Sequence, residues 1–311
     1  MKKIIFMFLL LVVALTAISC GTQEEKTDAP SDKTEATEPV TTNEINIIIL
    51  CGQSNAEGHT WWIEMKKKNP QLYKKYLKKE DSVLKMKFSC NGGTYKNDSY
   101  ESVKFGLGFN KDRFGPEVGM NEAYEGTNLT RPTYILKYTM GASDLYSQWR
   151  SYSSGATGYL YDGMINFLFE EIGKLEEEGY IPYVKAVCWM QGEADSTNNS
   201  KTEKYETYLD NFIKDLNSDL SGYVEDDKIL FVDAAISESS AWTNYLTINQ
   251  MKANVASLDP EYRVYIDTIA MGLDFRKEPT SGADLFHYDS LSMVELGKAF
   301  MNAILEKNIL K

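Results

Sequence analysis

Histidine and basic residues are scarce in this chain of 311 amino acids. Lys and Arg number 33 against 45 Asp and Glu, which gives a formal net charge of −12, and there are two histidines. An acidic protein repels phosphate backbones and anionic lipid headgroups, so we expect no nucleic-acid partner and no charge-driven binding to a membrane. If a histidine acts as a general base, it is either His59 or His287.

Cysteine is also scarce, with four residues and neither a Cys-x-x-Cys pair nor a Cys/His cluster of the zinc-binding kind. The sequence therefore predicts no metal site, and we expect no organic cofactor. Cys51 and Cys188 lie in apolar runs, where they are expected to be small core residues. With Cys90 they make an odd number, so at least one thiol stays free. Whether the other two form a disulfide is left open.

The N-terminus carries Lys2 and Lys3 before the apolar run 4–14, which is too short to span a membrane and is typical of a secretory signal. Small residues then lead into Cys20, and this arrangement resembles the lipobox of bacterial lipoproteins. The resemblance implies that residues 1–20 are a lipoprotein signal peptide and that Cys20 is acylated. The alternative is an ordinary cleaved signal with an incidental cysteine.

Residues 21–43 are almost entirely polar, so they cannot bury enough apolar surface to offset the entropy of ordering. They are predicted to form a flexible linker. Glu24 and Glu25 follow the anchor closely, as in some lipoproteins that are displayed on the cell surface. We therefore expect an exported protein, lipid-anchored to a bacterial outer membrane and facing the periplasm or the cell surface. The lipid is its expected contact with the membrane, and the oligomeric state is not indicated.

Residues 44–311 are predicted to form a single α/β domain. Short apolar runs typical of strands buried on both faces recur at 45–51, 133–140, 184–190, 229–235 and 262–269. Patterns typical of helices lie between or after them, at 159–178, 202–220, 242–258 and 290–307. This alternation predicts a parallel sheet between two helical layers. The segment 59–111 fits poorly, offers only 83–88 as a strand, and is expected to be a long loop region.

Polar residues follow two of the apolar runs directly, where ligands bind in a doubly wound sheet. Ser54 stands in a tight turn after the first run, at a place where an alkoxide nucleophile would be useful; the alternative is that Ser54 and Asn55 only cap a helix. The run 184–190 leads into Gln191-Gly192-Glu193-Ala194-Asp195, in which the glycine allows close backbone approach. These two edges are expected to face each other across one crevice.

A carboxylate and a histidine stand three residues apart near the C-terminus, at Asp284 and His287. In a turn this spacing lets Asp284 reach Nδ1 of His287, which fixes the tautomer and leaves Nε2 free as a base. His59 has no carboxylate at this offset, so His287 is the preferred base. His59 is expected to line the site at most, and as an isolated loop histidine to be unimportant to the chemistry.

Three motifs together resemble the SGNH hydrolase superfamily, and within it the branch of sialate O-acetylesterases and acetylxylan esterases. They are Gly-Gln-Ser-Asn at 52–55, Gln-Gly-Glu-x-Asp at 191–195 and Asp-x-x-His at 284–287. Segments 113–117 and 136–149 resemble the family more loosely, and Ala142 stands where the family often has a second glycine. The resemblance implies a three-layer α/β/α sandwich with a parallel, flavodoxin-like sheet.

The resemblance also implies a role for each matching residue. Ser54 is the expected nucleophile, His287 its base, and Asp284 the acid that orients His287. The oxyanion is expected to be held by the backbone amides of Ser54 and Gly115 and by the side-chain amide of Gln191. Because some relatives are thought to use the glutamate of Gln-Gly-Glu, Glu193 is a second candidate for the role of Asp284, and its alternative role is a buried structural one.

The predicted function is that of a serine esterase that hydrolyses O-acetyl esters on carbohydrates, either sialic acid or xylan-type glycans. Candidate substrate-binding residues are Asn55, Lys137 and Trp149, with Trp61 and Trp62 as further rings for stacking and Arg113 and Arg150 as further cations for a sialic acid carboxylate. Two alternatives remain: an SGNH lipase or thioesterase, and a surface lipoprotein that binds glycans without catalysis.

Overall fold

The computed structural model describes residues 43–77 and 82–311. The predicted signal peptide 1–20, the acylation site Cys20 and nearly all of the predicted linker 21–43 lie outside these residues, so they stay predictions. Within the two described ranges, no helix is both long enough and apolar enough to cross a membrane.

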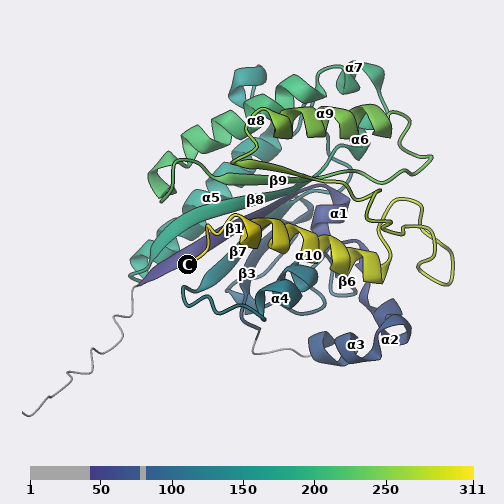
Figure 1. The fold of residues 1–311 in the computed structure, drawn as a ribbon, viewed down its shortest axis with the longest axis horizontal. Coiled ribbons are helices and arrows are strands. Elements are labelled where there is room, and N and C mark those ends of the chain that lie inside the picture. Colours follow the sequence, from purple (N-terminus) through teal and green to yellow (C-terminus); the bar gives the residue numbers. More distant parts are fainter. Residues whose placement is uncertain (1–42, 78–81) are drawn as a thin grey trace, which may run out of the picture. The chain divides into compact units, whose positions relative to one another are not determined.

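The core of the fold is an eight-stranded sheet whose six main strands run parallel in the order β10-β9-β8-β1-β7-β3 (Figure 1). Their bounds are β1 Glu44–Gly52, β3 Lys85–Cys90, β7 Thr133–Thr139, β8 Ile181–Met190, β9 Leu230–Ala234 and β10 Arg263–Ile266. Two short strands, β4 (Tyr95–Lys96) and β5 (Glu101–Ser102), pair antiparallel with β3. A separate two-stranded sheet joins β2 (Thr60–Trp61) to β6 (Arg113–Phe114).

Helices cover both faces of the sheet (Figure 1). One layer consists of α5 (Tyr159–Glu177), α8 (Tyr205–Asp219) and α9 (Tyr245–Ser257), with the short α6 (Glu193–Ser196) and α7 (Asn199–Thr202). The other contains α4 (Glu117–Tyr124) and α10 (Ser290–Glu306), next to α2 (Met65–Lys68) and α3 (Pro70–Leu77). The one-turn helix α1 (Ser54–Glu57) follows β1, and single 3₁₀ turns occur at Trp62–Glu64, Asn91–Gly93, Tyr152–Ser154 and Ser221–Tyr223. The predicted three-layer α/β/α class is confirmed.

Strand β1 lies at the centre of the sheet, and its side chains from Ile45 to Cys51 are completely buried. After β1 the chain moves out to β3, returns to β7 on one side of β1, and then crosses to β8 on the other side. In the flavodoxin order, by contrast, the first strand lies between the second and the third. Since the strand order reverses around β1, a crevice is expected beyond its carboxyl end. That end carries Ser54.

The segment 59–111 is more regular than expected. It contains α2 and α3, and the strand expected at 83–88 is observed as β3, a parallel strand of the main sheet. The helical signal of α3 was weak because its buried stripe consists of only Leu72 and Tyr76 among lysines and other polar residues. Cys51, Cys90 and Cys188 are all buried free thiols, so the open question of a disulfide is answered in the negative for the described cysteines.

Helices α4 and α10 approach each other at a pair of glycines. A Cβ atom added to Gly297 would lie 2.0 Å from the carbonyl oxygen of Pro116, and one added to Gly119 would lie 1.9 Å from the carbonyl oxygen of Val294. Neither contact is possible without moving one helix, because each partner is a backbone atom. The packing of this layer on the sheet therefore depends on both glycines.

Substitution of Gly297 by Ala should reduce the free energy of unfolding by about 1–3 kcal/mol or more, since overpacking forces a backbone shift. Gly173 in α5 is the matched control because a Cβ there meets nothing within 4 Å. Gly173→Ala should instead raise stability by up to about 1 kcal/mol through helix propensity. Urea denaturation midpoints measure both changes, and equal effects would contradict the close packing of α4 and α10.

Candidate active site

Ser54 begins α1 directly beyond the carboxyl end of β1. Gly52 makes this turn possible: its φ is 133°, and a Cβ there would lie 2.1 Å from the carbonyl oxygen of Met190 at the end of β8. The Gln53 amide donates to that same oxygen at 2.9 Å. Ser54 is 7% exposed and lines a cleft of about 540 Å³. The strand ends thus hold the serine at the wall of a cavity large enough for a small substrate.

His287 lines the same cleft and comes from the irregular segment between β10 and α10. Its Nδ1 donates to Oδ2 of Asp284 at 2.6 Å, and Oδ1 of Asp284 accepts from the Phe286 amide at 2.7 Å. Burial alone would raise the pKa of Asp284, but the hydrogen bonds from His287 and the backbone outweigh it and hold this pKa below its usual value. With Nδ1 donating, Nε2 is left with its lone pair.

Within the described residues, no hydrogen bond joins the Ser54 hydroxyl to His287. Contacts of this kind are often long in an enzyme without substrate and tighten when substrate binds. The two side chains share one cleft, so the arrangement is compatible with proton transfer between them.

Glu193 is fully buried at the start of α6 and does not hydrogen-bond to His287. Its Oε1 accepts from Nδ2 of Asn55 at 2.9 Å, and its Oε2 has no partner in the described part of the chain. Burial raises the pKa of Glu193, although the hydrogen bond from Asn55 opposes this shift. The carboxylate that contacts the histidine is therefore that of Asp284, whereas Glu193 contacts the residue beside the serine.

Asn55 holds the chain on both sides of His287. Its Nδ2 donates to the carbonyl oxygen of Phe286 at 3.3 Å, and its Oδ1 accepts from the Tyr288 amide at 3.2 Å. The hydroxyl of Thr60 adds a bond of 2.7 Å to the Tyr288 carbonyl oxygen. Because the side chain of Asn55 is buried and all its bonds are made within the protein, the prediction that it binds substrate is wrong for this geometry. It positions the loop of His287 instead.

Two of the three predicted oxyanion donors are already engaged elsewhere. The amide of Gly115 donates to Oε1 of Glu117 at 2.8 Å. Nε2 of Gln191 is buried and donates to Asp195 at 2.6 Å and to the Ser143 carbonyl oxygen at 3.0 Å. Neither residue lines the cleft. The predicted positions are therefore corrected: both groups support neighbouring loops rather than facing the serine.

The other predicted substrate-binding residues also lie away from the cleft. Lys137 is completely buried and bonds to Oε2 of Glu117 at 3.0 Å. Trp149 is a core residue whose indole N–H donates to Ser143 at 2.7 Å. Arg113 stacks over Trp61, and Nε of Arg150 donates to the carbonyl oxygen of Ala156. These side chains failed as predictions because proximity in sequence to a motif does not specify on which face of a strand or loop a side chain emerges.

The cleft contains residues that sequence reasoning underrated or missed. His59, which was expected to be unimportant, lines it and stacks on His287 with ring centroids 4.5 Å apart. Phe109, Trp242 and Phe286 supply aromatic walls, and Phe286 is 48% exposed. The position of His59 five residues after Ser54 was a usable signal. Trp242 and Phe109 had none, because the fold brings them in from distant segments.

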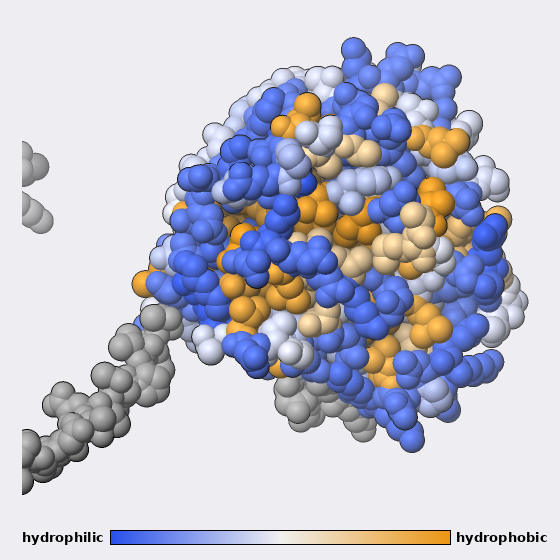
Figure 2. All heavy atoms as spheres, in the orientation of Figure 1, coloured by the Kyte–Doolittle hydropathy of each residue, from blue (hydrophilic) through white to orange (hydrophobic). Residues whose placement is uncertain are grey.

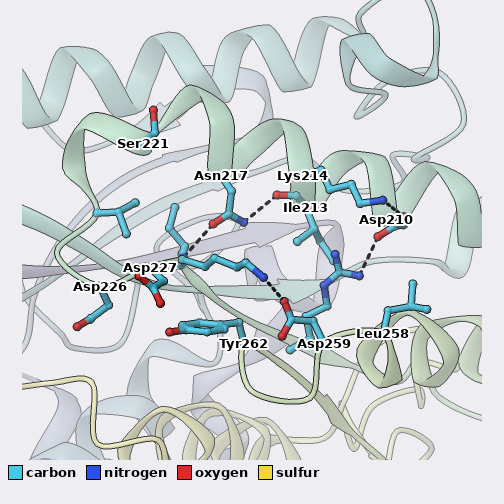
Figure 3. Close-up of a pocket in the computed structure, with 14 residues that line it drawn as sticks. Asp210, Ile213, Lys214, Asn217, Ser221, Asp226, Asp227, Leu258, Asp259 and Tyr262 are labelled. Carbon is cyan, nitrogen blue, oxygen red and sulfur yellow. Dashed lines mark hydrogen bonds and ion pairs between the residues drawn. The ribbon is translucent and has the colours of Figure 1, made fainter.

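A second hollow of about 570 Å³ lies at the opposite end of the sheet, near the amino ends of β9 and β10 (Figure 3). All of its basic side chains pair with carboxylates of the same lining: Lys228 with Asp259, and both Lys214 and Arg263 with Asp210. This hollow lacks the converging reactive groups of the Ser54 cleft. No cluster of potential metal ligands occurs among the described residues.

The face of the molecule shown in Figure 2 does not suggest another site. Hydrophilic residues predominate on it, and hydrophobic ones form separate patches. Scattered apolar residues of this kind are normal on soluble domains. The cleft that contains Ser54 is therefore the candidate active site.

Comparison with known proteins identifies the family of the chain. Residues 44–306 match the family described as carbohydrate esterase, sialic acid-specific acetylesterase. The chain belongs to this family. The match begins at β1 and ends with α10, so it spans every element of this carbohydrate esterase that contributes to the cleft. No curated protein matches the chain.

Two solved structures resemble this carbohydrate esterase in fold. A protein from Arabidopsis thaliana is 21% identical with a TM-score of 0.59, and the alignment covers 84% of this chain and 98% of that one. The structure of NanS is 14% identical with a TM-score of 0.54, and the alignment covers 86% and 98% of the two chains. At these identities the likeness shows the fold alone.

The different contacts of the two carboxylates predict different losses of activity. Asp284→Asn should lower kcat by up to about 10⁴-fold, since the wrong tautomer of His287 is then favoured. Glu193→Gln keeps an oxygen that accepts from Asn55, so its loss should stay below about tenfold. Steady-state kinetics on a short acetyl ester measure both, with thermal melting as the check on folding. Comparable inactivation of two folded variants would mean that Glu193 acts on His287 directly.

Proposed function

We propose that this carbohydrate esterase removes O-acetyl groups from sugars by nucleophilic catalysis at Ser54. The observation that carries the proposal is that Ser54 and His287 line one cleft of about 540 Å³, with Nδ1 of His287 bonded to Asp284 at 2.6 Å. A hydroxyl, an oriented imidazole and a carboxylate are the groups that acyl transfer through a serine requires. The family match supports hydrolysis of carbohydrate esters in general.

In the first half of the reaction, Oγ of Ser54 attacks the carbonyl carbon of the acetyl group while Nε2 of His287 takes the hydroxyl proton. The carbonyl electron pair moves to oxygen. When it returns, the bond to the sugar oxygen breaks, and that oxygen takes the proton from His287. The products are the free sugar hydroxyl and acetylated Ser54. In the second half, water repeats the attack with the same base and releases acetate.

The developing oxyanion needs N–H donors that are not already engaged. The Ser54 amide lies in the first turn of α1, where helical amides have no partner within the helix. Ala142 lines the same cleft and has a left-handed φ of 55°, at the position where the family often has a second glycine. Neither amide has an acceptor within the described residues. These two backbone groups are therefore the proposed donors, in place of Gly115 and Gln191.

The lining of the cleft favours a neutral sugar over sialic acid. Trp242 and Phe286 pack together with ring centroids 5.5 Å apart, and they provide flat apolar faces of the kind that stack on pyranose rings. The formally charged side chain in the described lining is that of Glu57, which would repel a substrate carboxylate. The overall charge of −12 acts in the same direction.

The place of action rests on the sequence. A lipid-anchored, exported enzyme would meet polymeric or surface-bound glycans that cannot enter the cytoplasm. Acylation at Cys20 and a polar linker over 21–43 remain part of this proposal. Metabolic labelling with a palmitate analogue, compared between the wild-type chain and Cys20→Ala, tests it.

Replacement of Ser54 by Ala should abolish release of acetate from a short acetyl ester, because the other hydroxyl in the described lining, that of Thr197, donates to the Ala194 carbonyl oxygen. Ser221→Ala, at the opposite end of the sheet, is the matched control and should keep full activity. A fluorophosphonate should label the wild-type protein at Ser54 and leave the Ser54→Ala variant unlabelled. Activity of Ser54→Ala within about tenfold of wild type would rule out the nucleophile assignment.

Acetylated xylo-oligosaccharides should be hydrolysed with a kcat/KM at least about tenfold above that for O-acetylated sialic acid, given the charge of the cleft. Trp242→Ala should raise KM for the oligosaccharide by about tenfold, the equivalent of one stacking contact, and leave a small aryl acetate unaffected. Acetate release across this panel measures both effects. A preference for sialic acid contradicts the neutral-sugar proposal, and a preference for long acyl chains favours a lipase.

A further inference from the structure

His287 stands on a segment without regular secondary structure, between β10 and α10. Asp284 fixes one edge of its ring but belongs to the same segment. Asn55 fixes the backbone on both sides of His287, but it makes no bond to the ring itself. The ring therefore still needs a contact from outside its own segment if it is to keep a fixed position relative to Ser54. Productive geometry matters because a displacement of about 1 Å can reduce a rate by about 10²-fold.

His59 supplies such a contact across the face of the His287 ring. The two imidazoles are stacked with their centroids 4.5 Å apart and their planes 21° from parallel. The other face of His59 stacks on Phe109, also at 4.5 Å, with an angle of 30°. The amide of Phe109 donates to the carbonyl oxygen of Gly58 at 2.9 Å, which fixes this outer ring to the turn after α1.

Glu57 holds the middle ring in its plane. Nε2 of His59 donates to Oε2 of Glu57 at 2.7 Å, and Oε1 of Glu57 accepts from the Asn91 amide at 2.6 Å. Glu57 is completely buried and lies three residues after Ser54 on the same one-turn helix. The element that carries the nucleophile therefore also holds the ring that supports the base.

The charge state of His59 suits this role. Burial lowers its pKa, the hydrogen bond to Glu57 opposes the shift, and the charges of His287 and Arg113 add to the lowering. His59 is thus neutral near pH 7, with a proton on Nε2. A neutral aromatic face beside His287 does not repel the imidazolium that forms when the base takes the proton of Ser54, whereas a second cation at 4.5 Å would.

We infer that His59, held by Glu57, is a positioning residue for the general base: its ring fixes the plane of His287 relative to Ser54. This inference rests on the proposed function, since it assigns His287 the role of base. It predicts that a flat side chain at position 59 is what turnover requires, rather than the imidazole nitrogens.

Two variants test the planarity of the side chain at position 59 separately from its hydrogen bond, because both lose the bond to Glu57. His59→Phe keeps a planar face and should retain kcat within about threefold of wild type. His59→Leu fills similar space without a plane and should lower kcat about 10- to 100-fold, with KM for a small aryl acetate changed less than about threefold. Labelling of Ser54 by a fluorophosphonate should slow in parallel. Phe169→Leu, which removes an exposed ring on α5 that lies at a tilt against Tyr223, is the control and should leave kcat unchanged.

Equal kcat values for the Phe and Leu variants, whether high or low, would overturn the inference. If either variant fails to fold, the same pair is made in the Glu57→Gln background, where the unpaired buried group is neutral and less costly. Wild-type protein that is no more active than Ser54→Ala would refute the proposed function itself. An active wild type with indistinguishable Phe and Leu variants refutes only the role of His59.

Discussion

The side chain of Asn55 joins the three segments on which the site depends. It lies next to the serine, accepts and donates bonds on both sides of His287, and is itself held by Glu193 at 2.9 Å. Along the chain, Asn55 is 138 residues from Glu193 and 231 residues from Phe286, so the relative positions of these segments depend on buried polar bonds rather than on local structure. Such bonds are strong in a dry interior and leave costly unpaired groups when one partner is lost. The motif residue Glu193 thus acts through an amide rather than on the histidine.

Helix α1 carries several of the side chains that build the site. This single turn contains Ser54, Asn55, which bonds to the His287 loop, and Glu57, which bonds to the His59 ring stacked on His287. All three side chains leave this helix in different directions, toward the cleft, α6 and the ring stack. The motif Gly-Gln-Ser-Asn is therefore only part of a longer functional segment that runs to His59. Ser54 lines the cleft, and its hydroxyl has no hydrogen-bond partner among the described residues.

Prediction from sequence succeeded where the signal was local. The buried run of β1, the long helix α5 and the spacing of Asp284 and His287 all express periodicity or short chain distance, and the structure has each of them. Prediction failed for Gly115, Gln191, Lys137 and Trp149, whose proximity to motifs was known but whose direction was not. A one-residue change along a strand reverses the face on which a side chain lies. The direction of a side chain is decided by packing against residues that are distant in the sequence.

The sequence by itself determined the class of fold, the main strands and helices along the chain outside 59–111, and the three motifs, because these follow from hydrophobic period and residue type. Only the tertiary structure decided which carboxylate bonds to His287. It also decided that Asn55 holds the His287 loop instead of facing the substrate, and that His59, Phe109 and Trp242 line the cleft. The physical reason is that each of these contacts joins segments brought together by the crossovers of the sheet. The free energy of such a contact depends on the distance between the two groups in space, which cannot be read from their separation along the chain.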